Sequence, residues 1–268
     1  MPEGPETHFV ADRLRAVLVG APLEQVAFAD PGLQRCAGTL CGHRIASVQA
    51  RGKALLTCFD HGVTLYTHSQ LLGRWDIHSP PRPVRGEPRA YLATPRGSAA
   101  LYIAPKVELW RTSELDAHPF LARLGPDVLD PAVTPAVFVA SLRSSRFARS
   151  TLATLLLKQE FAAGMGNYLR SEVLFRARLS PHRRVAQLEG DARRRLAHAL
   201  IDVPRLAYRA KFRGRPPASD KDYLPQLADT FAFGVFEREG EACPDCGGRV
   251  GMERIAGRRV YWCPRCQR

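Results

Sequence analysis

Four cysteines near the carboxyl end constrain the fold of this chain more than any other feature. Cys243 and Cys246 form one pair, and Cys263 and Cys266 form a second pair after 16 intervening residues. Two such pairs, each on a tight turn, are typical of the four thiolates that bind one tetrahedral zinc ion. Four protein ligands leave no open position on the metal, so we expect a structural Zn²⁺ that holds a C-terminal hairpin. Redox or disulfide use of the pairs is the alternative.

The net charge favours a polyanionic partner. Thirty-nine Lys and Arg residues exceed 26 Asp and Glu residues, which gives +13 at pH 7. Cationic side chains gain affinity for nucleic acid because they release counterions condensed on the phosphates. A basic surface also serves solubility alone, so charge by itself leaves that explanation open. The segment between the cysteine pairs is itself cationic, with Arg249, Arg254, Arg258 and Arg259.

The chain carries no sign of secretion or membrane insertion. No apolar run approaches the roughly 18 residues that a membrane-spanning helix needs, and the acidic start of the chain is unlike a secretory signal. An odd number of cysteines, seven, argues against a disulfide framework. We therefore expect a cytoplasmic protein with no membrane partner. Cys36, Cys41 and Cys58 match no ligand spacing, and we expect them to be packing residues.

The periodicity of apolar residues changes along the chain. Residues 6–20 have helical spacing, and short apolar runs separated by turns from about 42 to 112 predict a β-rich region. Several helix-stopping residues in 118–135 predict a linker. The remaining predicted segments are helices at 135–143, 151–159, 167–179 and 187–209 and a long polar loop at 212–226.

The reactivity of the amino terminus depends on whether Met1 is removed. While Met1 is present, the nitrogen of Pro2 belongs to an amide and is not nucleophilic. Removal of Met1 exposes a secondary amine that can attack an electrophilic sugar carbon and form an iminium. Glu3 is then placed to act as a proton donor or a carboxylate. A proline that merely limits local flexibility is the alternative.

Four motifs in this order resemble the formamidopyrimidine-DNA glycosylase and endonuclease VIII family. They are Met1-Pro-Glu-Gly-Pro-Glu6, Arg51-Gly-Lys-Ala-Leu-Leu56, Gly164-Met-Gly-Asn-Tyr-Leu-Arg-Ser-Glu172 and the four-cysteine tail. Within the family, the start, Thr67-His-Ser-Gln-Leu71 and the region from His118 to Asp130 are most similar to bacterial endonuclease VIII. The resemblance implies an α+β fold: an N-terminal β-sandwich-like domain with a helix (1–117), a linker (118–134), a helical helix–two-turn–helix domain (135–228) and a zinc-finger hairpin (229–268).

The resemblance also implies an activity. It predicts a bifunctional DNA glycosylase and AP lyase that removes oxidised pyrimidines from damaged double-stranded DNA in base excision repair, through a Schiff base at Pro2 and β,δ-elimination. The implied cellular setting is the nucleoid of a bacterial cytoplasm, and we expect a monomer. Two alternatives remain open: a non-catalytic binder of damaged DNA that keeps Met1, and a glycosylase directed at 8-oxoguanine and formamidopyrimidines.

The family motifs assign roles to individual residues. The catalytic positions are Pro2, Glu3, Lys53 and Arg258, and the DNA-binding positions are Gln70, Leu71, Leu72, Asn167, Glu172 and Arg259. Four of them have a plainer alternative: Lys53 as a solvated turn lysine, Leu71 and Leu72 as core residues, and Asn167 as a helix cap. A one-residue slip of the hairpin register would exchange Arg258 and Arg259.

Overall fold

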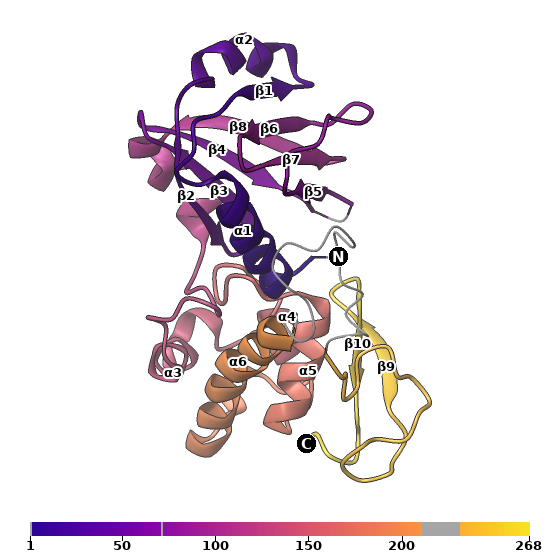
Figure 1. Ribbon diagram of the computed structural model, residues 1–268. Helices are drawn as coiled ribbons and strands as arrows, with labels where there is room; N and C mark the ends of the chain where they lie inside the picture. Colours follow the sequence, from indigo (N-terminus) through magenta and orange to yellow (C-terminus); the bar gives the residue numbers. More distant parts are fainter. Residues whose placement is uncertain (1, 71, 211–230) are drawn as a thin grey trace. The chain divides into compact units, whose positions relative to one another are not determined.

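The computed structural model describes residues 2–70, 72–210 and 231–268, which form two compact units (Figure 1). The first unit contains Pro2 and Glu6–Ala122, and the second contains Glu3–Pro5, Arg123–Ala210 and residues 231–268. Leu71 and the loop predicted at 212–226 lie outside the described residues. The first unit consists of α1 (Gly4–Leu18, whose first residues belong to the second unit), β1 (Gln25–Phe28), α2 (Pro31–Leu40), β2 (Ile45–Arg51), β3 (Ala54–Phe59), β4 (Val63–His68), β5 (Arg74–His78), β6 (Ala90–Thr94), β7 (Gly97–Tyr102), β8 (Lys106–Arg111) and η1 (Thr112–Ala117).

Two antiparallel sheets form the first unit. One has the strand order β2-β3-β4-β8 and the other β1-β6-β7-β5. Apolar side chains of both sheets share one core with α1, as Leu65 of β4, Leu92 of β6 and Leu14 of α1 illustrate. The helical spacing predicted for residues 6–20 is confirmed, because the apolar residues that define it are all buried: Phe9, Val10, Leu14, Val17 and Leu18.

Helices and a β-hairpin form the second unit. Its elements are η2 (Leu121–Arg123, which starts in the first unit), α3 (Pro135–Arg143), η3 (Ser145–Phe147), α4 (Leu152–Leu155), α5 (Asn167–Ala177), η4 (Val185–Gln187), α6 (Gly190–Ala210), β9 (Gly251–Ile255) and β10 (Arg258–Trp262). α5 and α6 share a core of aliphatic side chains, among them Leu169, Val173, Leu196 and Leu200. β9 and β10 pair as an antiparallel hairpin. None of the described helices is long and apolar enough to cross a membrane.

The predicted α+β class is confirmed, with two local differences. The helix predicted at 151–159 ends at Leu155, because the side chain of Gln159 binds Gly164 N and Met165 O and turns the chain toward α5. Cys36 and Cys41 are exposed, so the expectation that they pack in the interior was wrong. Both lie in or beside α2, whose only buried residues are Ala37 and Leu40.

Gly97 provides a test of how tightly α1 packs on the β6–β7 turn. A Cβ at this position would lie 2.5 Å from the carbonyl oxygen of His78 and 2.8 Å from Cβ of Val17. We expect Gly97→Ala to lower the free energy of unfolding by about 1–3 kcal/mol, because a backbone carbonyl cannot move aside cheaply. Calorimetric melting of the purified chain measures this loss.

Gly38 is the matched control for that variant. It lies on the exposed face of α2, and a Cβ there would meet nothing within 4 Å. Gly38→Ala should raise the stability by roughly 0.5–1 kcal/mol because alanine restricts the unfolded chain. Equal melting temperatures for Gly97→Ala and the unaltered chain would contradict the close packing.

Candidate functional site

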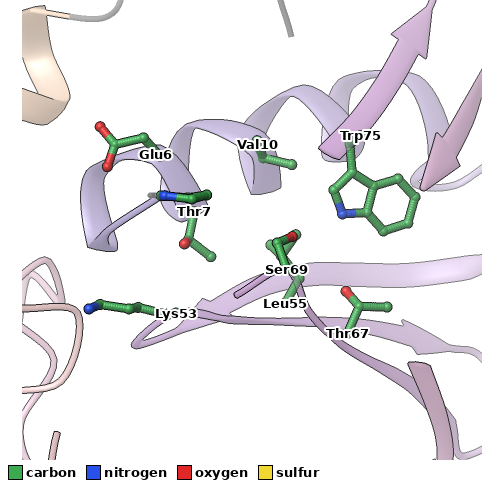
Figure 2. A pocket seen from close by; sticks show the side chains of 9 residues that line it. Glu6, Thr7, Val10, Lys53, Leu55, Thr67, Ser69 and Trp75 are labelled. Atoms are coloured by element: carbon green, nitrogen blue, oxygen red, sulfur yellow. The ribbon is translucent and has the colours of Figure 1, made fainter. Parts of the chain in front are cut away.

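Pro2 lines a pocket in the first unit. The pocket encloses about 310 Å³, including space open to solvent. Figure 2 shows that its wall comes from the first turns of α1, the start of β3 and the segment from β4 to β5. The lining residues are Pro2, Glu6, Thr7, Val10, Lys53, Leu55, Thr67, Ser69 and Trp75. The structure thus brings two of the residues predicted to be catalytic, Pro2 and Lys53, to the same pocket.

The turn between β2 and β3 places Lys53. Arg51 pairs with Ala54 across the turn, and Gly52 has a φ of 62°, a left-handed conformation that glycine adopts without strain. Figure 2 shows the Lys53 side chain at the opposite end of the pocket from Trp75. A cation on a tight turn at the pocket mouth suits binding of an anionic group.

His68 supplies a neutral ring next to this lysine. Burial, and after it the positive charge of Lys53, lower the pKa of His68 to about 4. Nδ1 of His68 accepts a hydrogen bond from the backbone N–H of Gln70, 3.1 Å away. His68 is therefore uncharged at neutral pH and leaves Lys53 as the cation of this pair.

Trp75 adds a donor to the pocket wall. Only 1% of its surface is exposed, and among the described residues Nε1 finds no hydrogen-bond partner. Figure 2 shows this nitrogen on the edge of the ring that faces the other lining residues. Because an unpaired buried N–H is costly, a polar group bound in the pocket would gain a hydrogen bond here.

Glu3 caps α5 from the far end of the sequence. Its Oε1 accepts from the backbone N–H of Tyr168 at 2.9 Å, and Oε2 accepts from that of Leu169 at 3.2 Å. These are N–H groups of the first helical turn, which have no partner within the helix. The carboxylate also lies at the positive end of the helix dipole. Glu3 is 2% exposed, so the N-terminal chain segment is fixed to this helix.

Two glycines make room for this contact. A Cβ on Gly166 would lie 2.2 Å from Cδ of Glu3. Gly164 has a φ of +91°, and its carbonyl accepts from the backbone N–H of Gly4 at 2.8 Å. The Gly-Met-Gly sequence before α5 therefore allows the backbone and the Glu3 side chain to approach closely.

Asn167 is the first residue of α5 and does not cap it. Gly166 occupies the N-cap position. Oδ1 of Asn167 instead accepts from Nη2 of Arg170 at 2.7 Å. The side chain is half-buried. The alternative that Asn167 acts as a helix cap is thus wrong.

Arg170 connects α5 to the hairpin turn. Its guanidinium donates to the carbonyl oxygens of Arg258 and Arg259, at 3.3 and 2.7 Å. Burial, and after it the positive charge of Arg258, lower the pKa of Arg170 to about 10, and the charge of Glu3 opposes this shift. The two arginine side chains themselves are exposed. The turn therefore presents both predicted phosphate-binding cations, Arg258 and Arg259, on a fixed backbone.

Glu172 uses its carboxylate within the second unit. It accepts hydrogen bonds from the backbone N–H groups of Gly234, Val235 and Phe236, at 2.9, 3.0 and 2.8 Å. Burial raises the pKa of Glu172, and these three bonds oppose the rise. Glu172 therefore fixes the segment that leads into the cysteine hairpin.

The four predicted cysteine ligands come together. Their Sγ atoms all lie within 4.8 Å of one another. Cys243 Sγ is 3.8 Å from Cys266 Sγ, and Cys246 Sγ is 3.5 Å from Cys263 Sγ. Four thiolates at ~2.3 Å from one tetrahedral zinc lie ~3.8 Å apart, so the cluster fits the ion. The predicted structural zinc site is confirmed, and its role is to hold the β9–β10 hairpin.

The predicted wedge residues lie on the connection between β4 and β5. Gln70 is exposed and has a φ of 47°, and 72% of the Leu72 surface is exposed. Leu72 is therefore not a core residue. Gly73 closes the connection, since a Cβ there would lie 2.6 Å from Cα of Ser69. Leu71 lies outside the described residues.

Sequence reasoning missed Arg170 and Trp75. The sequence carries no local signal for Arg170, because only the structure shows that this charged residue of α5 is fully buried. Trp75 carries no such signal either, because its alternation with the polar residues Arg74 and Asp76 predicts an ordinary buried position of a strand.

Comparisons with known proteins connect these features to a family. The Formamidopyrimidine-DNA glycosylase N-terminal domain matches residues 1–106, and the Formamidopyrimidine-DNA glycosylase H2TH domain matches residues 124–214. Endonuclease 8 of Shigella flexneri serotype 5b (strain 8401) is 42% identical over 270 residues, and Endonuclease 8 of Escherichia coli O6:K15:H31 (strain 536 / UPEC) is 43% identical; both alignments cover 100% of each chain. The structure is also similar to Lactococcus lactis Fpg in a complex with DNA containing an abasic site, with a TM-score of 0.83, 22% identity and 99% of both chains covered. That last likeness supports the fold.

Zinc content tests the cysteine cluster. We expect one zinc per chain, and we expect Cys266→Ala to lose it because three thiolates bind the ion far more weakly. Cys36→Ala is the matched control, since Cys36 is exposed and remote in sequence from the cluster. Elemental analysis measures the metal, and limited proteolysis should cut the hairpin of Cys266→Ala first. Full zinc in Cys266→Ala would contradict the four-thiolate assignment.

Proposed function

This chain belongs to the formamidopyrimidine-DNA glycosylase and endonuclease VIII family, and we propose that the nitrogen of Pro2 is its nucleophile. The protein is an endonuclease VIII-like DNA glycosylase with AP lyase activity in base excision repair. The family and this activity were both expected from the sequence motifs. The observation that carries the proposal for Pro2 is its position in the wall of a pocket that also contains Lys53.

The proposed substrate is an oxidised pyrimidine in duplex DNA. The relatives that are 42% and 43% identical over their full length carry the name Endonuclease 8. The formal charge of +13 suits a polyanion. A structure of Lactococcus lactis Fpg contains an oxidised pyrimidine in DNA, and another contains an abasic site. The first ligand belongs to the proposed substrate class, and the second corresponds to the site that remains after the base has been removed.

The proposed reaction begins once Met1 has been removed. The lone pair of the Pro2 nitrogen forms a bond to C1′, and the bond from C1′ to the base breaks, with the electron pair leaving on the base. The departing base takes up the proton that the Pro2 nitrogen loses, and Glu3 gives a proton to the sugar oxygen as the ring opens and the nitrogen lone pair forms the iminium. The resulting iminium acidifies the C2′ proton, and its loss expels the 3′ phosphate by β-elimination. A further δ-elimination expels the 5′ phosphate and leaves a one-nucleotide gap.

The hydrogen bonds of Glu3 support a fixed position for this carboxyl group. Its two oxygens are 2.9 and 3.2 Å from backbone nitrogens of α5. Pro2 is the preceding residue, so the peptide bond limits how far the amine can move from the carboxyl group. General acid catalysis needs a protonated carboxyl group beside the nucleophile, so the proposed step requires Glu3 to take up a proton although its bonds to α5 stabilise the carboxylate.

Residues of the pocket, the β4–β5 connection, α5 and the hairpin supply the proposed DNA contacts. Lys53 and Arg258 bind phosphates near the lesion, and Arg259 binds a neighbouring phosphate. Gln70, Leu71 and Leu72 fill the space left by the flipped base, which costs a few kcal/mol to remove from the stack. The 72% exposure of Leu72 favours this role. The side-chain amide of Asn167 binds phosphate at the start of α5, and Glu172 supports the site through the segment it fixes.

Each region of the chain has a proposed role. We assign catalysis to 1–117, linkage to 118–134, DNA binding to the helix–two-turn–helix region at 135–228, and phosphate contact to the zinc hairpin at 229–268. One asymmetric lesion suits a monomer. The proposed place of action is DNA in the bacterial cytoplasm.

Blocking the amine tests the proposed nucleophile. Two preparations differ only at the start of the chain, one beginning at Pro2 and one retaining Met1. We expect the blocked form to lose roughly 10³-fold or more in single-turnover cleavage of duplexes containing thymine glycol or dihydrouracil, because the attacking lone pair is delocalised. Intact mass identifies each preparation.

Two controls separate chemistry from folding and substrate choice. The blocked form should retain its zinc and bind an abasic-site analogue within about threefold of the free form, since both preparations share every other contact. Full turnover by the blocked form would contradict the role of Pro2. Faster cleavage of an 8-oxoguanine duplex than of the pyrimidine substrates would instead assign the purine-directed activity.

A further inference from the structure

A second cluster of possible metal ligands lies in the first unit. His43, Asp60 and His61 place one nitrogen or oxygen each within 4.8 Å of the others. In the described part of the chain, this cluster and the four cysteines are the two groups with that property. None of its three residues lines the pocket that contains Pro2.

Interatomic distances in the cluster match those around a bound metal ion. Oδ1 of Asp60 is 2.9 Å from Nδ1 of His43 and 3.6 Å from Nδ1 of His61. Two nitrogen or oxygen ligands at ~2.1 Å from one ion lie ~3.0–3.4 Å apart, in octahedral or tetrahedral geometry. The two distances from Asp60 Oδ1, 2.9 and 3.6 Å, lie just below and just above that range. All three atoms lie within 4.8 Å of one another, as ligands of one ion do.

The backbone fixes the central carboxylate. Oδ2 of Asp60 accepts from the backbone N–H of Arg44 at 3.1 Å, which leaves Oδ1 toward the two histidines. The backbone N–H of Asp60 donates to the carbonyl oxygen of Arg44 at 2.9 Å. The Arg44 hydrogen bond is the largest cause of a lowered pKa for Asp60, so the group is an anion at neutral pH. A hydrogen bond to the second oxygen of a ligating carboxylate is typical of metal sites.

The two rings are held in adjacent turns. His43 follows Gly42, which has a φ of 84°, and His61 precedes Gly62, which has a φ of 82°. The ring centroids are 3.9 Å apart with an interplanar angle of 31°. Phe59 contacts the His61 ring at 5.8 Å between centroids. Both Nδ1 atoms thus face the same oxygen from rings that neighbouring residues orient.

From this geometry we propose that His43, Asp60 and His61 bind one late first-row divalent ion, such as Ni²⁺ or Zn²⁺, at the surface of the first unit. Imidazole nitrogen with one carboxylate oxygen suits these ions. The hydrogen-bonding proton on His43 moves to Nε2 when Nδ1 binds the metal. Three protein ligands leave the other positions to water, because the cluster is solvent-accessible.

The site is separate from the reaction. Lys53 precedes the first residue of β3, and Asp60 follows the last. A strand of six residues spans ~20 Å, so the ion would lie at the far end of β3 from the Pro2 pocket. The bound ion would connect the turn at 41–44 to the β3–β4 turn at 60–62.

The test is a calorimetric titration of the zinc-loaded full chain, without an affinity tag, with Ni²⁺. We expect one Ni²⁺ per chain with no release of zinc. Asp60→Asn and His61→Ala should each weaken the affinity by ~10-fold or more, as loss of a ligand does. His182→Ala is the matched control, because its Nε2 has one carboxylate neighbour, Glu253 at 2.9 Å, and belongs to no three-ligand group of the described residues.

Paramagnetic broadening by Ni²⁺ gives a readout that needs no variant. In the unaltered chain, the amide signals of residues 43–44 and 59–62 should broaden first. Three results would overturn the proposal: no Ni²⁺ uptake, Ni²⁺ uptake matched by zinc release, or equal affinity in Asp60→Asn, His61→Ala and the unaltered chain. Broadening centred elsewhere would also do so, even if a variant failed to fold.

Discussion

The carboxylate of Glu3 at the start of α5 is the contact on which the second unit and the amino terminus both depend. Without it, two N–H groups of a buried helix end would have no partner, at a cost of ~1–3 kcal/mol each. The interaction with the helix dipole adds up to ~2 kcal/mol in a partly buried setting. The contact requires Gly166, because any side chain there would overlap the carboxylate. One acidic residue therefore ties the position of the chain's first residues to the packing of a helix more than 160 residues away.

Further contacts of this kind follow along α5. Its first turn holds Glu3, its fourth residue, Arg170, binds carbonyl oxygens of the hairpin turn, and Glu172 binds backbone N–H groups of residues 234–236. The zinc cluster fixes the same hairpin at its other end. Backbone atoms make most of these contacts, so the side chains of Arg258 and Arg259 stay available for phosphate. A rigid base with exposed cations is what positioning of DNA phosphates requires.

Local chemistry explains what the sequence could predict. The cysteine spacing encodes two turns and four ligands within 24 residues, and the apolar spacing of residues 6–20 encodes α1. The family resemblance pointed to Pro2 and Lys53, and the pocket contains both. The sequence around α5 could not predict its cap. A helix is normally capped by the side chain of its N-cap residue, but here that residue is Gly166, and the distant Glu3 caps the helix instead. Arg170 and the indole of Trp75 have roles that depend on partners far away in sequence, which no local spacing records.

The most direct measurement of the central claim is the location of the covalent bond to DNA. Borohydride reduces an iminium to a stable amine, so a chain beginning at Pro2 and incubated with an abasic duplex can be trapped, digested with trypsin and sequenced by mass spectrometry. The account predicts that the deoxyribose remnant lies on the nitrogen of Pro2, in the peptide of residues 2–13. A remnant on Lys53 or on any other side-chain amine, with the Pro2 peptide unmodified, would contradict it.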